Sequence, residues 1–305
     1  MERLDAITLP PRPEAPDVRG RPSCLPLIDS HCHLDFLFRN KGIRDQSLTT
    51  FLGRQRQFLK RPYPLPADWV GAVSVWCDPR LFGTAKDILL REGRAWATFG
   101  CHPHHVALYN ANIHAEIKDK ICHLPPAVAW GEIGLDYFQK PDRPPPDIPC
   151  QKRVFRLQLQ AAGAMGLPVV IHCRDAEEDL FKILRSTLHH QHPIHYHCVT
   201  VPPAKIQPVM DHFPRAKFGF TNLVGQQGSR GRAACESVRA IPLHRLLAET
   251  DAPYHCPSAW AKNDKSPSHP GMAMEVVKKF ATLKDLPLPS VAQQVYRNTC
   301  SLYGL

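Results

Sequence analysis

The chain has 305 residues, of which 43% are hydrophobic and 22% are charged, and these values exclude a disordered or fibrous protein. No apolar run approaches the roughly 18 residues that cross a bilayer, and the N-terminus lacks the apolar stretch of a secretory signal, so no membrane association is expected. The formal net charge of +10 weakly favours a polyanionic partner, although an excess of Lys and Arg can also serve solubility alone.

The eleven cysteines are too sparse for a disulfide scaffold, and their odd number and irregular spacing argue against a bridged framework. No CxxC pair is present, which argues against a structural zinc ribbon. We therefore expect a reducing, intracellular compartment, either nuclear or cytoplasmic. No feature of the sequence identifies an obligate protein partner.

Residues 1–23 are rich in Pro and charge and are expected to form a disordered leader or linker. From 24 to 305 the composition is uniform, which predicts a single catalytic domain. Short apolar runs predict strands at residues 25–30, 70–77, 95–100, 127–133, 168–172, 192–197, 216–220 and 245–250. Helical periodicity predicts helices at residues 84–92, 151–165, 176–188, 203–212, 231–240, 271–281 and 288–303.

Eight strands alternating with helices match an α/β fold of the TIM-type (β/α)8 barrel in count and length. The competing architecture is an open, doubly wound sheet. That sheet would need a Gly-rich phosphate-binding loop after an early strand, and the chain contains neither a GxGxxG nor a Walker sequence.

Six side chains that can bind metals fall at the C-terminal ends of predicted strands. They are His31, His33, Glu132, His172, His197 and Asp251. Barrel enzymes build their active sites at this rim. Because residues so far apart in sequence meet only if the strands close into a ring, their placement predicts a metal-dependent hydrolase of the barrel type.

The first strand ends in His31-Cys32-His33, and residues two apart on an extended chain point to the same side. Both imidazoles can therefore reach one ion, and Asp29 on that face could orient one of them. Glu132 lies in an apolar segment, where a carboxylate is costly unless it is paired or binds a cation. A salt bridge to a neighbouring Arg is the alternative for Glu132.

For the fifth, sixth and eighth predicted strands, the sequence leaves more than one interpretation of the side chains near the rim. His172 could be an ordinary core histidine, and Arg174 beside it could hold a phosphate or pair with an aspartate, Asp175 or Asp179. Spacing along the strands favours His197 over His195, and Asp251 over Glu249, because the favoured residues lie nearer the rim.

Four imidazoles and two carboxylates are enough ligands for two divalent ions if Glu132 bridges them. The first ion would take His31, His33 and Asp251, and the second His172 and His197. Such a pair can activate a water and hold both oxygens of an in-line displacement, and Asp251 could accept the proton of the water. We expect Mg²⁺ or Mn²⁺ to support activity, with Zn²⁺ as an alternative, because imidazoles suit zinc and manganese whereas magnesium prefers oxygen.

Six ordered segments resemble the TatD-type metal-dependent nucleases. They are residues 28–35 (IDSHCHLD), 100–104 (GCHPH), 131–137 (GEIGLDY), 168–175 (PVVIHCRD), 197–198 (HC) and 249–254 (ETDAPY). The resemblance implies a barrel fold, divalent metals and hydrolysis of phosphodiester bonds in DNA or RNA, typically as an exonuclease acting from a 3′ end. It supports the same six metal ligands and implies that His102 and Arg174 help to hold a substrate phosphate, with His104 less certain.

The chain departs from the family pattern at two places. Val199, Thr200 and Val201 replace the usual aromatic, small hydroxyl and Gly residues after His-Cys, and residues 255–270 lack the usual Arg-Gly pair. Substrate contacts near the sixth and eighth strands are therefore not inferred from the family.

A basic insertion covers residues 36–66, which carry seven Lys or Arg residues and only one acid. Because it follows the first strand, it should lie above the metal centre, where Arg54, Arg56, Lys60 and Arg61 are expected to bind a single-stranded nucleic acid. Interleaved aromatics could stack on bases, but packing on the barrel is the favoured interpretation for them. We thus predict a metal-dependent nuclease acting on single-stranded DNA or RNA ends. The alternatives are a hydrolase of a small ester, amide or phosphoester, and a binding module with a degenerate centre.

Overall fold

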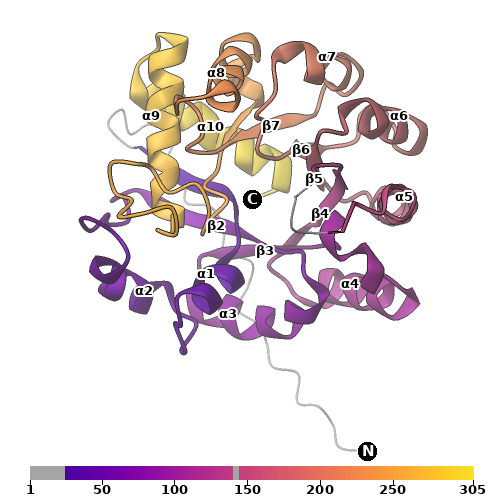
Figure 1. The fold of residues 1–305 in the computed structure, drawn as a ribbon, viewed down its shortest axis with the longest axis horizontal. Helices are drawn as coiled ribbons and strands as arrows, with labels where there is room; N and C mark the ends of the chain where they lie inside the picture. Colours follow the sequence, from indigo (N-terminus) through magenta and orange to yellow (C-terminus); the bar gives the residue numbers. More distant parts are fainter. Residues whose placement is uncertain (1–24, 140–143) are drawn as a thin grey trace, which may run out of the picture.

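The computed structural model describes residues 25–139 and 144–305, so the predicted leader at 1–23 lies outside the described residues. Eight strands form one sheet in which neighbours in the chain are parallel neighbours in space. The strands are β1 Leu27–Cys32, β2 Trp69–Trp76, β3 Ala95–Phe99, β4 Ala127–Asp136, β5 Val169–Arg174, β6 Ile194–Tyr196, β7 Lys217–Phe220 and β8 Leu246–Ala248. This order and the surrounding ring of helices confirm the predicted TIM-type barrel (Figure 1).

The ring closes between the first strand and the residues that follow β8. The amide of Asp251 donates to the carbonyl of His31 at 2.9 Å, and the amide of His33 donates to the carbonyl of Ala252 at 2.7 Å. Inside this seam the carboxylate of Asp29 accepts from the amides of Thr250 and His31, at 3.0 and 3.2 Å. Two predicted metal ligands, His31 and Asp251, are therefore hydrogen-bonded neighbours because the barrel closes.

Ten α-helices cover the outside of the barrel in the described part of the chain. They are α1 Leu34–Asn40, α2 Leu48–Arg54, α3 Ala85–Glu92, α4 Ala111–His123, α5 Ile148–Ala164, α6 Glu177–Thr187, α7 Pro203–His212, α8 Ser229–Ala240, α9 Ala273–Lys284 and α10 Leu288–Tyr303. Side-chain caps start several of them. Asn110 accepts from the amide of Ile113 at 3.0 Å, and Asp147 accepts from the amide of Cys150 at 3.0 Å. None of these helices is long and apolar enough to cross a bilayer.

The end of the ring opposite the predicted site is filled by the C-terminus. Leu302 and Tyr303 of α10 pack in one cluster with Ile28, Val73 and Val170 from strands around the ring. Figure 1 shows the C-terminus near the centre of the barrel. The predicted site lies at the opposite rim, where the strands end.

The observed elements differ from the predicted ones mainly in the first quarter of the barrel. Helix α4 was not predicted, and helices α1 and α2 lie in the basic insertion, for which no helix bounds were predicted. The strand predicted at 25–30 extends to Cys32, and those predicted at 127–133 and 168–172 extend to Asp136 and Arg174. Several predicted rim residues therefore lie within the strands.

Candidate metal centre

The structure brings the six predicted metal ligands together at the C-terminal rim. His31, Glu132 and His172 lie in the last part of β1, β4 and β5, and His33, His197 and Asp251 follow β1, β6 and β8. Four of the six, His31, His33, Glu132 and His197, are less than 5% exposed. The side chains of His172 and Asp251 are 18% and 13% exposed, so the site is largely withdrawn from water. Their convergence is the geometry that the sequence predicted.

The first group of donors surrounds one oxygen of Glu132. Its Oε2 lies 3.7 Å from the Nε2 atoms of both His31 and His33. The Oδ1 of Asp251 lies 3.3 Å from Nε2 of His33 and 3.7 Å from Nε2 of His31. The two imidazole Nε2 atoms are 3.3 Å apart. These are the residues predicted to hold the first ion.

The second group surrounds the other oxygen of Glu132. Its Oε1 lies 2.9 Å from Nδ1 of His172 and 3.3 Å from Nε2 of His197. Nε2 of His102 is 3.7 Å from the same oxygen. The carboxylate of Glu132 therefore faces a different set of imidazoles with each oxygen, as a bridging ligand would.

The spacing and charge of the first group fit a divalent cation. Ligand atoms about 2.1 Å from one tetrahedral ion lie about 3.4 Å from each other, close to the separations of 3.3 to 3.7 Å found here. In the described residues no Lys or Arg pairs with Glu132, so the alternative salt bridge is wrong. Burial alone would raise the pKa of Glu132, but the imidazoles of His197, His102 and His172 hold that pKa well below its usual value.

The second group contains an imidazole, that of His172, whose surroundings favour its protonated form. His172 lies between two carboxylates, with Nε2 at 3.2 Å from Asp136 and Nδ1 at 2.9 Å from Glu132. Burial lowers the pKa of His172, but hydrogen bonds to Asp136 and Glu132 outweigh it and raise that pKa to about 9. A metal ligand must be deprotonated, so an ion bound here would displace this proton.

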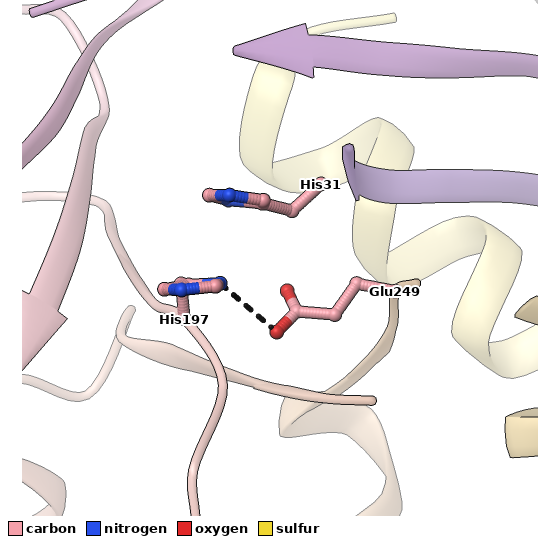
Figure 2. Close-up of side chains that lie close together, drawn as sticks. All are labelled: His31, His197 and Glu249. Carbon is pink, nitrogen blue, oxygen red and sulfur yellow. Dashed lines mark ion pairs between the residues drawn. The ribbon is translucent and has the colours of Figure 1, made fainter. Parts of the chain in front are cut away.

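Two of the predicted ligands have a neighbour on the ring nitrogen that faces away from the centre. Nδ1 of His33 lies 2.9 Å from the carbonyl oxygen of Val75, which fixes the tautomer that leaves Nε2 free. Nδ1 of His197 lies 3.2 Å from Oε1 of Glu249, and its ring stacks on that of His31 at a centroid distance of 3.9 Å. Figure 2 shows the ring of His31 above that of His197, with the carboxylate of Glu249 beside His197.

Glu249 is a buried carboxylate that was not predicted to bind a metal, because Asp251 lies nearer the rim. Its oxygens accept from Nε2 of His195 at 2.8 Å and from the amide of Cys198 at 2.6 Å, in addition to contacting His197. Glu249 lies close enough to His31 and His197 for the three side chains to hold a metal ion. Its oxygens, however, already accept hydrogen bonds from protein groups. We therefore assign it to positioning His197 rather than to holding an ion directly.

The pair of Glu249 and His195 depends on a glycine in β7. A Cβ at Gly219 would collide with the carboxylate of Glu249 and approach Nε2 of His195 to 2.5 Å. His195 is completely buried, and its Nδ1 lies 2.6 Å from the hydroxyl oxygen of Tyr303. A continuous chain of contacts thus runs from the C-terminal helix to His197.

His102 is placed to donate a hydrogen bond into the centre. Its Nδ1 accepts from the amide of His104 at 3.0 Å, so in the neutral ring the proton is on Nε2, which faces Glu132. Burial and the neighbouring His172 hold the pKa of His102 well below its usual value, which keeps the ring neutral. His102 is therefore better suited to donating to a substrate oxygen than to binding an ion.

Asp136 also lies at the site, although no role was predicted for it from the motif at residues 131–137. Its Oδ2 lies 2.8 Å from Nε2 of His104 and 3.2 Å from Nε2 of His172. Its spacing from Glu132 could have revealed it, since residues four apart on a strand share a face. Burial would raise the pKa of Asp136, but hydrogen bonds from His104 and His172 lower it.

Arg174 lies at the rim without a carboxylate partner in the described residues. Its guanidinium stacks on the ring of Phe138 at 3.5 Å from the centroid. The alternative pairing with Asp175 or Asp179 is not found, and Asp179 instead pairs with Lys152 at 2.6 Å. The guanidinium is therefore available to a substrate phosphate, as the resemblance implies.

The residues that follow β8 and β6 turn sharply at the rim. Asp251 and Cys198 both have positive φ, 54° and 49°, a conformation that costs non-glycine residues of the order of 1–3 kcal/mol. The turn after Asp251 also brings Nε2 of His255 to 3.4 Å from its Oδ2. No sequence signal marked His255, because its contact depends on this turn.

The contacts that the structure gives for the predicted cations Arg54, Lys60 and Arg61 are with the insertion itself and with the loop at residues 253–266, not with the predicted metal ligands. Arg54 donates to the carbonyl of Gly42 at 3.2 Å, and the guanidinium of Arg61 lies 5.1 Å from the ring centroid of Trp260. Lys60 donates to the carbonyl of Ser258 at 3.3 Å, and Arg56 is exposed. The insertion aromatics Phe38 and Phe51 are buried, as the packing interpretation expects.

One predicted orientation is wrong. Asp29 was expected to orient an imidazole, but it accepts from the backbone amides of His31 and Thr250 instead. The reason is that its strand lies at the barrel seam, where these amides would otherwise be buried without partners.

Comparison with known proteins shows similarity through the whole described body. The family model described as TatD related DNase matches residues 28–304. Human 3'-5' RNA nuclease TATDN2 is 38% identical over 280 residues, which are 91% of this chain and 35% of that protein. This confirms the closer similarity to the human TatD DNase domain-containing protein 2 that the ordered motifs also predict. The chain spans about a third of the length of this relative.

Two further proteins show the same pattern. The 3'-5' ssDNA/RNA exonuclease TatD of Erwinia amylovora is 31% identical over 214 residues, covering 69% of this chain and 78% of that protein. The crystal structure of YJJV, a TatD homologue of Escherichia coli, has a TM-score of 0.73 at 23% identity and covers 92% of this chain and 98% of that one. The latter likeness is one of fold.

Proposed function

The chain belongs to the family of TatD-related DNases, and we propose that it is a divalent-metal-dependent nuclease that hydrolyses phosphodiester bonds of single-stranded DNA or RNA. We further propose that it acts as an exonuclease from the 3′ end, with two ions, Mg²⁺ or Mn²⁺ in activity and Zn²⁺ as an alternative. The names of its relatives, a 3'-5' RNA nuclease and a 3'-5' ssDNA/RNA exonuclease, support this polarity and substrate class.

The observation that carries the proposal is the position of Glu132 between two sets of imidazoles. His31, His33 and Asp251 would hold one ion with its Oε2, and His172 and His197 the other with its Oε1. Bound divalent ions in such a site lower the pKa of a water and neutralise charge on a phosphate. No Lys or Arg of the described residues takes that role beside Glu132.

The side chains of the protein then supply positioning and proton transfer. Nε2–H of His102 and the guanidinium of Arg174 would hold the non-bridging oxygens of the scissile phosphate. Asp251, which contacts His33 with one oxygen and His255 with the other, would accept the proton of the attacking water. Glu249 would keep His197 in the ligating tautomer.

The location and partners follow from the same proposal. The substrate partner is a nucleic acid, and we propose a nuclear or cytoplasmic location. The ten cysteines of the described residues are all free thiols, which supports a reducing compartment.

The test is digestion of single-stranded DNA and RNA oligonucleotides of matched sequence with added Mg²⁺ or Mn²⁺. We expect cleavage that is abolished by a chelator and reduced at least about 100-fold in Glu132→Ala. A 5′ label should yield a ladder of shortening products if the enzyme works from the 3′ end, whereas a 3′ label should be released as a mononucleotide. Persistent metal-dependent cleavage by Glu132→Ala would refute the bridging role of Glu132.

A further inference from the structure

A large groove borders the metal centre on the side of the basic insertion. It has a volume of about 1530 Å³ and lies between the end of α1, the loop at residues 253–266, the loop after β7 and α9. Figure 1 shows the loop at 253–266, in orange, between α9 and the helices α1 and α2. The metal ligands do not line this groove, so it is a separate surface.

The groove carries an excess of positive charge. Its lysines are Lys41, Lys60, Lys262, Lys265 and Lys279. In the described part of the chain, none of these five forms an ion pair with a carboxylate. The acids that line the groove are Asp264 and Glu275, and Glu275 is already engaged by Lys278 at 2.8 Å and by the hydroxyl of Tyr63 at 2.9 Å. The uncompensated charge is therefore available to a polyanion.

Several of these ammonium groups are held in place by the backbone. Nζ of Lys41 donates to the carbonyl of Lys265 at 2.7 Å, and Nζ of Lys262 donates to the carbonyl of Arg56 at 2.7 Å. Each ammonium has three donors, so others remain for a phosphate oxygen. Because these side chains are already fixed, less conformational entropy is lost when a phosphate binds.

The groove continues into the metal centre through Tyr254 and His255, which line it. Tyr254 is 47% exposed, and the centroid of its ring lies 6.4 Å from that of His33. His255 contacts Asp251 at 3.4 Å. The groove therefore lies directly beside the first group of predicted ligands.

We propose that this lysine groove binds the sugar-phosphate backbone of the single-stranded nucleic acid behind the end that is cleaved. The proposal rests on the nuclease function and adds a binding surface to it. The surface differs from the one that the sequence suggested, because only Lys60 of the four predicted cations lines the groove. Contacts to the backbone make the surface tolerant of base sequence and sensitive to salt.

The test compares two sets of triple substitutions in the full chain. The groove variant is Lys60→Gln, Lys262→Gln and Lys265→Gln, in which glutamine keeps a donor but loses the charge. The control variant removes three charges from α3 and α4 on another side of the barrel, with Lys86→Gln, Lys118→Gln and Lys120→Gln. A third protein carries Arg at the three groove positions and keeps the charge there.

Binding is measured with chelator present by fluorescence anisotropy, using labelled oligothymidylate and oligouridylate of about 12 nucleotides. We expect the groove variant to bind about 10-fold or more weakly than the unsubstituted protein. Its slope of log affinity against log salt should fall by about 2, since each phosphate contact to a single strand contributes about 0.7. The control and Arg variants should bind like the unsubstituted protein. Manganese-dependent hydrolysis of bis(4-nitrophenyl) phosphate, which does not extend into the groove, should be the same in all proteins.

Equal affinities in all four proteins would overturn the proposal, and so would an equal loss in the groove and control variants or a loss in the Arg variant. These outcomes are separate from failure of the nuclease function. That failure would appear as normal binding in chelator without metal-dependent cleavage of either oligonucleotide.

Discussion

Glu249 illustrates how much of the centre depends on residues that do not hold an ion. Its carboxylate accepts from Nε2 of His195 and the amide of Cys198, lies 3.2 Å from Nδ1 of His197 and is completely buried. Burial would raise the pKa of Glu249, but the imidazoles of His197 and His195 lower it and keep the carboxylate charged. A charged acceptor on Nδ1 makes Nε2 of His197 a better ligand.

Glu249→Gln should weaken metal binding more than it impairs catalysis at saturating metal. The amide removes the charge that supports His197, and loss of such an outer partner typically lowers metal affinity about 10- to 100-fold. The measurement is nuclease rate against the concentration of free Mn²⁺. We expect the half-maximal concentration to rise by that factor while the rate at saturation recovers in large part.

The matched control is Glu236→Gln, which removes the same charge from an exposed position of α8. It should leave the metal dependence unchanged. If Glu249→Gln and Glu236→Gln gave the same half-maximal metal concentration, Glu249 would have no positioning role.

At the scale of elements, the insertion and the loop at residues 253–266 form one unit above the barrel. Leu59 and Ala261 form an isolated antiparallel bridge, and the amide of Lys60 donates to the carbonyl of Trp260 at 2.9 Å. His269 lies beneath this unit, with ring centroids 5.9 Å from Phe51 and 5.7 Å from Tyr63. Its burial lowers its pKa to about 4.

This burial predicts a pH-dependent contribution to stability. The unfolded imidazole binds a proton below pH 6.5 and the folded one only below about 4, so the unfolded state binds more protons between these values. The contribution of His269 is therefore complete above pH 6.5 and is lost as the pH falls toward 4. The shift corresponds to about 3 kcal/mol.

The test compares the unsubstituted protein with His269→Asn. In the native protein Nδ1 of His269 accepts from the amide of Gly271 at 3.2 Å, and Oδ1 of the asparagine can replace it as acceptor. The free energy of urea unfolding is measured for both proteins from pH 4 to 7. We expect the free energy of unfolding of the substituted protein, relative to that of the unsubstituted protein, to be higher at pH 4 than at pH 7. Parallel pH profiles of the two proteins would contradict a buried neutral imidazole.

At the scale of the whole molecule, the C-terminal helix joins the closed end of the barrel to the metal centre. The hydroxyl of Tyr303 lies 2.6 Å from Nδ1 of His195 and 3.3 Å from the carbonyl oxygen of Ser30. His195 contacts Glu249, and Glu249 contacts His197. The last helix is thus connected to a ligand formed more than a hundred residues earlier.

Tyr303→Phe should lower both stability and metal affinity. Removing the hydroxyl leaves buried polar groups without their hydrogen-bond partner, which costs about 1–3 kcal/mol. The control is Tyr109→Phe, which removes a hydrogen bond of the same length, 2.6 Å, to His114 on the outside of the barrel. Thermal unfolding should shift in both proteins, whereas a higher half-maximal Mn²⁺ concentration is expected for Tyr303→Phe alone. An unchanged metal dependence in Tyr303→Phe would disprove the connection.

The sequence by itself determined the barrel and the set of residues at its rim. Apolar runs of strand length recur eight times between helical segments, and this pattern leaves few other ways to bury them. Because parallel strands end at one rim, the positions of His31, Glu132 and Asp251 at strand ends were sufficient to predict their convergence. The order of the motifs likewise identified the family.

Only the tertiary structure decided which neighbours orient these residues and where a strand of nucleic acid can lie. Spacing along a strand shows which face a side chain occupies but not which partner lies across the barrel. Glu249 therefore could not be assigned to His197, nor Tyr303 to His195. The lysine groove is formed by α1, α9 and two loops that are distant in the chain. Its lysines are not neighbours in the sequence, so a local run of basic residues does not reveal them. Such a run predicted Arg54 and Arg56 instead.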